Sequence, residues 1–160
     1  MDTLTMIALA KAGAPAALGF AALGSAIGIG TAGMAAIGAW KKAYMQNKAA
    51  PFILIAFIGA PLSQTIYGMI LMNVMNGICD AAMLALEQGQ DVIVNWPAML
   101  MAGIVGGMAM GASAAYQGKA GAAAADALGD TGQGFGNYLM TLGVVETVAL
   151  FVMVFIQASL

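Results

Sequence analysis

The sequence predicts an all-α membrane protein whose four transmembrane helices form two duplicated helical hairpins. Of its 160 residues, 62% are hydrophobic and only 8% are charged, and the mean hydropathy is +0.91. Soluble domains carry about 25% charged residues, so this composition indicates an integral membrane protein. Four apolar segments reach the length of about 20 residues that a spanning helix needs. They cover residues 15–39, 51–75, 97–117 or beyond, and 138–158.

The residue types that are missing exclude several kinds of chemistry. The chain has no Arg and no His, and its only cysteine is Cys79. A guanidinium must therefore come from another chain, and a multi-Cys metal site or an internal disulfide is excluded. No nucleotide-binding motif is present, so we expect a subunit that is not itself an enzyme, and a net charge of −2 gives no indication of nucleic acid. Residues 1–14 do not resemble a signal peptide, so a retained first helix is expected.

The lysines predict how the chain crosses the cell membrane. Four of the five lysines are assigned to the first and third connections, which by the positive-inside rule face the cytoplasm. Both termini then face outside, and the acidic second connection forms a solvated outer loop. The first connection is expected to hold Lys41, Lys42 and Lys48, and the third Lys119 with Asp126 and Asp130. The second is expected to hold Asp80, Glu87 and Asp91 and no lysine. Trp40, Tyr44 and Trp96 are expected to be interfacial anchors.

The two halves of the chain repeat in the same orientation. A shift of 88 positions places Ser25 on Ser113, and a shift of 82 places Gln64-Thr65 on Glu146-Thr147. This parallel duplication divides the chain into hairpins of residues 1–79 and 80–160, the second of which carries the carboxylate. Segments one and three also contain Gly and Ala at steps of four, which lets helices approach closely in lipid. A layer of such helices backed by bulkier ones suits a closed ring.

Glu146 is the main candidate functional residue. It is the only charged residue between 138 and 158. An ionisable group at membrane depth is costly and by default marks an ion path. The alternative is a protonated carboxyl that only holds two helices together.

Polar residues are expected at the same depth as Glu146. If the second hairpin turns near residue 131, Gln117 stands level with Glu146; in the first hairpin the position matching Glu146 is Gln64. Ser63 precedes Gln64, and Tyr67 lies on the same helix face. Pro61 removes a backbone donor and can free a carbonyl near the site.

This set of one carboxylate, two amides, a hydroxyl and a carbonyl favours Na⁺, since hard cations take oxygen ligands. A proton site needs fewer donors, and the same protein carrying H⁺ stays open as an alternative. A small four-helix exporter acting as a dimer and a purely structural scaffold also stay open. Gln64 and Gln117 could serve as interhelical hydrogen bonds alone, while Ser25 and Thr147 are expected to bond back to their own helices.

Three motifs together resemble the proteolipid subunit, the rotor-ring (K or c) subunit, of bacterial V/A-type rotary ATPases, most closely its sodium-translocating, duplicated four-helix form. They are Pro61-Leu62-Ser63-Gln64-Thr65-Ile66-Tyr67, Tyr116-Gln117-Gly118-Lys119 and Val145-Glu146-Thr147, and the resemblance extends from about residue 18 to residue 156.

The resemblance implies a homo-oligomeric ring that turns against a stator subunit in the lipid membrane, driven by ATP hydrolysis in partner subunits. It implies that the stator supplies an arginine and that central-stalk subunits contact the cytoplasmic loops. It further implies a Na⁺ site made by Glu146, Gln117, Gln64, Ser63 and the carbonyl of Ala60, with Tyr67 donating a hydrogen bond to the glutamate.

Overall fold

The computed structural model describes all residues, 1–160, and it contains helices and no strands. The helices are α1 (Thr3–Met45), α2 (Ile55–Gly59), α3 (Ser63–Glu87), α4 (Trp96–Thr131) and α5 (Phe135–Ser159), with 3₁₀ turns at Phe52–Leu54 and Ala60–Leu62. Four helical stretches are long and apolar enough to cross a membrane, one of them formed by residues 52–87 together. This confirms the predicted fold class.

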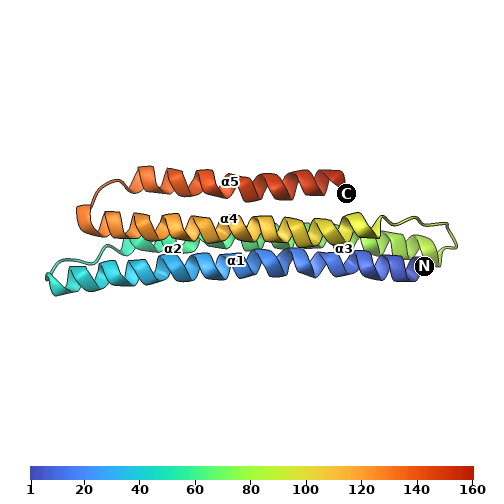
Figure 1. The fold of residues 1–160 in the computed structure, drawn as a ribbon, viewed down its shortest axis with the longest axis horizontal. Helices are drawn as coiled ribbons and strands as arrows, with labels where there is room; N and C mark the ends of the chain where they lie inside the picture. The colour runs from blue at the N-terminus through green and yellow to red at the C-terminus, as the bar shows by residue number, and fades with distance from the viewer.

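The four long helices lie side by side along one direction (Figure 1). The α1–α2 and α4–α5 connections lie at one end of the molecule, and the N-terminus and the α3–α4 connection lie at the other. The expected turn of the second hairpin is confirmed, because α4 ends at Thr131 and Gly132 caps it with φ of 66°. Gln46 and Asn47 likewise follow the end of α1, and Asn47 has φ of 50°.

The helices extend well beyond the apolar segments, and this corrects the predicted positions of several charged residues. Asp80 and Glu87 do not lie in the outer loop but within α3, and the Asp80 carboxylate accepts a hydrogen bond of 2.7 Å from Lys11 Nζ. The α3–α4 connection spans only residues 88–95, so the sequence-based division at residue 79 falls inside α3. Lys119, Asp126 and Asp130 are not in the third connection but inside α4, and Lys41 and Lys42 are inside the last turns of α1. Lys119 Nζ lies 4.6 Å from the centre of the Tyr116 ring.

Backbone contacts join α1 and α4 along most of their length. A Cβ built on Gly24 would overlap the backbone of Gly111, and one built on Gly118 would overlap the backbone of Gly28. The two helices therefore pack at a distance that only glycine permits at these positions. The contacts match residues about 88 positions apart, which agrees with the duplication predicted from the sequence.

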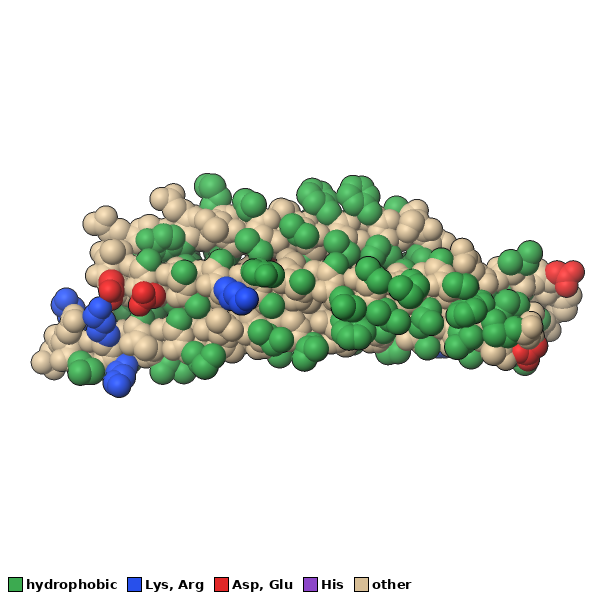
Figure 2. Space-filling model, viewed as in Figure 1, with side chains coloured by type: hydrophobic (Ala, Val, Ile, Leu, Met, Phe, Trp, Pro, Cys, Tyr) green, Lys and Arg blue, Asp and Glu red, His purple; other side chains and the backbone are tan.

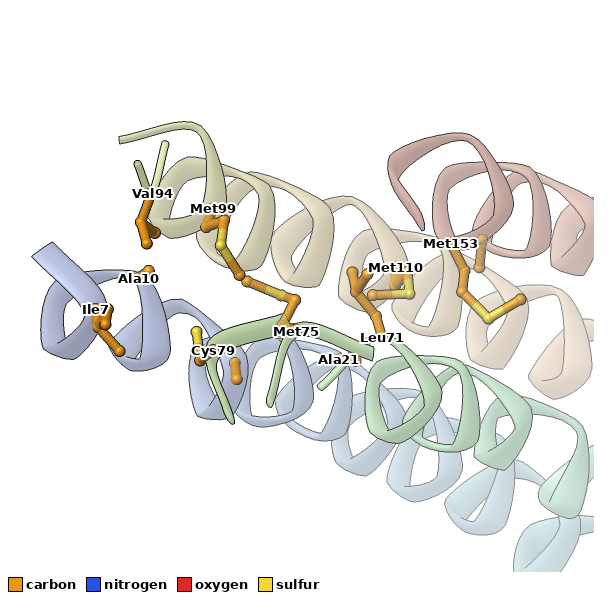
Figure 3. Close-up of a cluster of buried hydrophobic side chains, with 13 residues drawn as sticks. Ile7, Ala10, Ala21, Leu71, Met75, Cys79, Val94, Met99, Met110 and Met153 are labelled. Atoms are coloured by element: carbon orange, nitrogen blue, oxygen red, sulfur yellow. The ribbon is translucent and has the colours of Figure 1, made fainter. Parts of the chain in front are cut away.

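We call the close α1–α4 contact at Gly24, Gly28, Gly111 and Gly118 the glycine seam. Larger side chains form two buried clusters beside it, one toward each end of the molecule. Near the end that holds the N-terminus, Met75, Met99, Leu71 and Met110 lie in one buried cluster between the helices (Figure 3). A second cluster surrounds Phe57 at the other end. The charged side chains in Figure 2 gather mainly toward the two ends of the molecule, and the surface between them is mostly uncharged. This distribution fits a protein that spans a bilayer.

Candidate functional site

The site begins at a break in the second membrane-spanning stretch. Helix α2 ends at Gly59, residues Ala60–Leu62 form a 3₁₀ turn, and α3 begins at Ser63. Pro61 causes the break because it has no N–H to continue the α-helical bonding. It is buried, and a Cβ on Gly28 would lie 2.8 Å from the Pro61 Cβ, so glycine in α1 makes room for the proline ring. The turn leaves the carbonyl of Ala60 accessible to a side chain, and Ser63 Oγ donates to it at 3.1 Å.

Two glutamine side chains connect this turn to α4. Gln64 Nε2 donates a 2.8 Å hydrogen bond to Gln117 Oε1, and Gln64 Oε1 accepts one of 3.2 Å from Ser63 Oγ. Both glutamines are completely buried, with 0% of their surface exposed. Buried amides must find partners, and these side chains find them in each other, in Ser63 and in α5. Their hydrogen bonds join α3, α4 and α5 at one depth.

Glu146 completes the network from the middle of α5, eleven residues after Phe135 and thirteen before Ser159. Tyr67 donates from its hydroxyl to Glu146 Oε1 at 2.7 Å, and Gln117 Nε2 donates to Glu146 Oε2 at 3.2 Å. The glutamate is half-buried, whereas the glutamines behind it are fully enclosed. The carboxylate therefore lies at the edge of the polar cluster.

The structure brings together all seven residues that the sequence analysis proposed for this site. They are Ala60, Pro61, Ser63, Gln64, Tyr67, Gln117 and Glu146. The expected level of Gln117 beside Glu146 is confirmed by the hydrogen bond between them. That these residues bind an ion stays a prediction.

Two polar groups near the site were not found from the sequence. The carbonyl of Leu142 accepts a 3.0 Å hydrogen bond from Gln117 Nε2, and Ser113 Oγ donates to the carbonyl of Val145 at 2.9 Å. Leu142 stands 82 positions after Ala60, which is the shift that relates Gln64 to Glu146. That shift could have identified Leu142 as the second carbonyl facing the site.

The predictions for Thr147 and Ser25 have different outcomes. Thr147 Oγ1 donates to the carbonyl of Val144 at 2.7 Å, so it bonds back to its own helix as expected. Ser25 does not, because its hydroxyl has no hydrogen-bond partner although the residue is buried. The expected helix back-bond of Ser25 is therefore wrong.

The chemistry of the cluster suits a small monovalent cation or a proton. It holds one carboxylate among neutral oxygen donors, and the chain has no group of three or more His, Cys, Asp or Glu side chains that could hold a metal ion. One carboxylate balances one positive charge, whereas a divalent ion would leave excess charge at membrane depth. The fold and this network together define a multi-pass helical membrane protein with an ionisable site in its spanning region.

Comparison with known families agrees with this class. Residues 100–156, which cover most of α4 and α5, match the family model of the ATP synthase C subunit. The match covers the second hairpin alone, so it shows that this part of the chain is similar to the ATP synthase C subunit. The four helices fit a c subunit in which the hairpin is duplicated. No curated protein sequence matches the chain.

Proposed function

We propose that this protein is the ion-carrying rotor subunit of a bacterial V-type ATPase and that it binds one Na⁺ at Glu146. The observation that carries the proposal is the continuous hydrogen-bond network from the Ala60 carbonyl to the Glu146 carboxylate. Through this network two buried amides and a serine hydroxyl are connected to the only carboxylate at that depth.

The donors in this network exceed what a proton requires. A protonated carboxyl needs one or two partners, which Tyr67 and Gln117 provide. Gln64, Ser63 and the Ala60 carbonyl lie farther inside and add three more oxygens. Na⁺ is a hard cation that binds oxygen ligands, so it can use this inner part of the site. A cation shared by Gln64, Gln117 and Glu146 replaces the hydrogen bond between the two amides.

The charge of Glu146 explains how loading is linked to rotation. A bare carboxylate facing lipid costs on the order of 3 kcal/mol or more. With Na⁺ bound, the site is neutral and can pass through the hydrocarbon as the ring turns. Only loaded subunits then leave the stator, so ions move whenever the ring rotates. Tyr67, by donating to the carboxylate, holds the loaded side chain against the chain's own surface.

The remaining parts of the machine come from other chains. Identical copies form the ring, consistent with the homo-oligomeric rings of c-subunit proteins. A stator subunit supplies the arginine that faces an emptied Glu146, because this sequence contains no Arg. By the positive-inside rule, Lys41, Lys42 and Lys48 favour an orientation with the end that holds the α1–α2 connection in the cytoplasm and both termini outside. That end contacts the central stalk, and the ATP-hydrolysing subunits drive rotation.

The duplication sets the ratio of ions to ATP. Consider two rings with the same total number of helices. The ring with one carboxylate for every four helices carries fewer ions per turn than the ring with one carboxylate for every two helices. The energy of each turn is then divided among fewer ions. Moving one charge against 100 mV requires about 2.3 kcal/mol, so this ratio favours pumping against a steep gradient.

Carbodiimide labelling of the purified ring tests the ion. The labelling rate of Glu146, located by mass spectrometry, is measured at several Na⁺ concentrations and pH values. We expect Na⁺ to slow labelling in competition with protons, because a carboxylate that holds Na⁺ is not protonated. Labelling of Glu87, which is exposed at the end of α3, serves as the internal control and should not respond to Na⁺. Labelling of Glu146 that depends on pH alone would show that the rotor carries protons.

A further inference from the structure

The hydroxyl of Ser25 is the one buried side-chain polar atom in the chain without a hydrogen-bond partner. Ser25 lies in α1 and is only 2% exposed. An unpaired buried hydroxyl is unfavourable, since it loses its bonds to water without replacement. Its counterpart in the second hairpin, Ser113, is paired, because its hydroxyl donates to the Val145 carbonyl. The Ser25 hydroxyl is therefore free to form a hydrogen bond if a neighbouring side chain changes its orientation.

The contacts of α1 with α3 and with the turn before it indicate that Ser25 faces Gln64. A Cβ on Gly68 would lie 2.7 Å from the Ala21 Cβ, and one on Gly28 would lie 2.8 Å from the Pro61 Cβ. Both pairs of residue numbers add up to 89, as expected for antiparallel neighbours, and so do 25 and 64.

Spacing within each helix supports the same pairing. On α1, the buried positions 21, 25 and 28 lie on one face; on α3 and the turn before it, the buried positions 61, 64 and 68 do the same. Residues three and four apart share a face of a helix. Ser25 and Gln64 are thus the middle positions of two stripes that face each other.

Cation binding requires a new acceptor for the Gln64 amide. Gln64 Nε2 now donates to Gln117 Oε1. A cation that binds both amide oxygens cannot tolerate this N–H beside it, because the positive end of the N–H dipole would face the ion. The amide must turn its nitrogen away, and the nitrogen is completely buried, so an acceptor must be within the protein.

We propose that Ser25 is a positioning residue for cation binding: its hydroxyl accepts a hydrogen bond from Gln64 Nε2 and so turns Gln64 Oε1 toward the cation. The proposal rests on the proposed function of this site as a Na⁺ carrier. It also explains why a serine without a partner stands at this depth. The proton-loaded site does not need Ser25, because Glu146 is contacted by Tyr67 and Gln117 and not by Gln64.

The test compares Ser25→Ala with the unmodified ring in the labelling assay. Two quantities are measured: the Na⁺ concentration that halves the labelling rate of Glu146, and the pH dependence of labelling without Na⁺. Leaving a buried donor unpaired predicts a rise in the half-protecting Na⁺ concentration of about ten-fold. The pH dependence without Na⁺ should stay unchanged, which a general disturbance of the helix packing would not allow.

Two further variants make the result specific. Thr31→Ala removes another hydroxyl of α1, one that donates to the Ile27 carbonyl of its own helix, and it should change neither quantity. Adding Ser25→Ala to Gln64→Leu should weaken Na⁺ protection no further, since the amide that Ser25 serves is then absent.

An unchanged Na⁺ requirement in Ser25→Ala would overturn the role of Ser25, and so would equal shifts in Na⁺ protection and pH dependence. A failure of the proposed sodium function looks different, because labelling of the unmodified ring would then not respond to Na⁺ at all.

Discussion

The two hairpins are built alike but contribute differently to the site. In the second, α4 and α5 carry Gln117 and Glu146, and the family match falls within this hairpin. In the first, the matching positions hold Ile29 and Gln64, so that hairpin has no carboxylate at this depth. Yet its helices supply Tyr67 and the Ser63 turn, which reach toward the second hairpin. Duplication has therefore separated the charge from most of the neutral donors.

The two hairpins have in common a backbone carbonyl that accepts a hydrogen bond at the site. Ala60 and Leu142, 82 positions apart, each accept a hydrogen bond from a side chain of the site. In the first hairpin the donor is the adjacent Ser63, whereas in the second it is Gln117 from the other helix of the pair. The common geometry of the backbone thus persists while the side chains that use it have diverged.

The largest expected effect comes from removing the Glu146 carboxylate, and a second variant tests whether the first hairpin can replace it. Glu146→Gln should abolish Na⁺ transport by the whole ATPase in proteoliposomes, because the site loses its only charge, while the ring still assembles. Adding Gln64→Glu should not restore transport, since the side chain at position 64 is completely enclosed and has no direct path for ion release. Native mass spectrometry verifies assembly. Transport by the double variant would mean that the hairpins are interchangeable.

Gln117→Ile makes the second hairpin resemble the first at this position. The change removes hydrogen bonds to Glu146, Gln64 and the Leu142 carbonyl. A hydrogen bond to a charged group contributes about 1.5–3 kcal/mol, so we expect Na⁺ protection of Glu146 to weaken by about 10- to 100-fold. Ile29→Val is the control at the matching position and should have little effect. Equal effects of the two variants would contradict the assigned role of Gln117.

Tyr67→Phe removes the contribution of the first hairpin to the carboxylate. The second hairpin has Ala149 at the matching position, so nothing replaces the lost donor. We expect Na⁺ protection to weaken by about ten-fold, which corresponds to one hydrogen bond to a charged group. Tyr116→Phe is the matched control, because that tyrosine is exposed on α4 away from the network. The labelling assay measures both variants, and an unchanged Tyr67→Phe would exclude a role in holding the ion.

The pairing of Gln117 with Glu146 could be predicted from the sequence because it follows from simple geometry, whereas the bond from Tyr67 was expected from the family resemblance. A lone charge in an apolar run and the midpoint of a short turn determine that Gln117 stands level with it. Helix ends could not be predicted as well: α1 and α3 continue past their apolar segments, and Ile7, Ala10 and Cys79 are buried in these outer turns. Lys119, which charge alone assigned to a connection, also lies within a helix, with its Nζ over the Tyr116 ring.

The hydrogen-bond partners of buried side chains could not be predicted from the sequence. Ser25 and Ser113 occupy equivalent positions, yet only Ser113 has a partner. Which of them bonds to a neighbouring helix depends on the local approach of the backbones, and this approach is set by glycines that occur throughout both helices. Composition predicts that α1 and α4 pack closely, but it does not predict which atoms meet.

Gly24→Ala tests the seam that holds the two hairpins together. A Cβ at this position would overlap the backbone of Gly111, which cannot move aside as a side chain can. We expect a loss of stability of about 1–3 kcal/mol, as for other overpacked interiors. Gly38→Ala in the same helix has open space around it and should be neutral or stabilising by up to about 1 kcal/mol. Unfolding temperatures in detergent measure the difference, and equal values would exclude backbone contact as the basis of the seam.

The smallest expected effect concerns an ion pair that spans the repeat. Lys42 Nζ lies 2.6 Å from Asp130, 88 positions later, and so joins α1 to α4 at the end of the seam. Both side chains are about half exposed, and exposed ion pairs contribute little because water and salt screen them. Lys42→Ala should therefore lower the unfolding temperature only slightly, and about 0.5 M NaCl should remove most of the difference from the unmodified protein. Lys11→Ala, which breaks the α1–α3 pair within the first hairpin, should behave in the same way. A larger, salt-insensitive loss for Lys42→Ala alone would show that this pair, and not only the glycine seam, fixes one hairpin against the other.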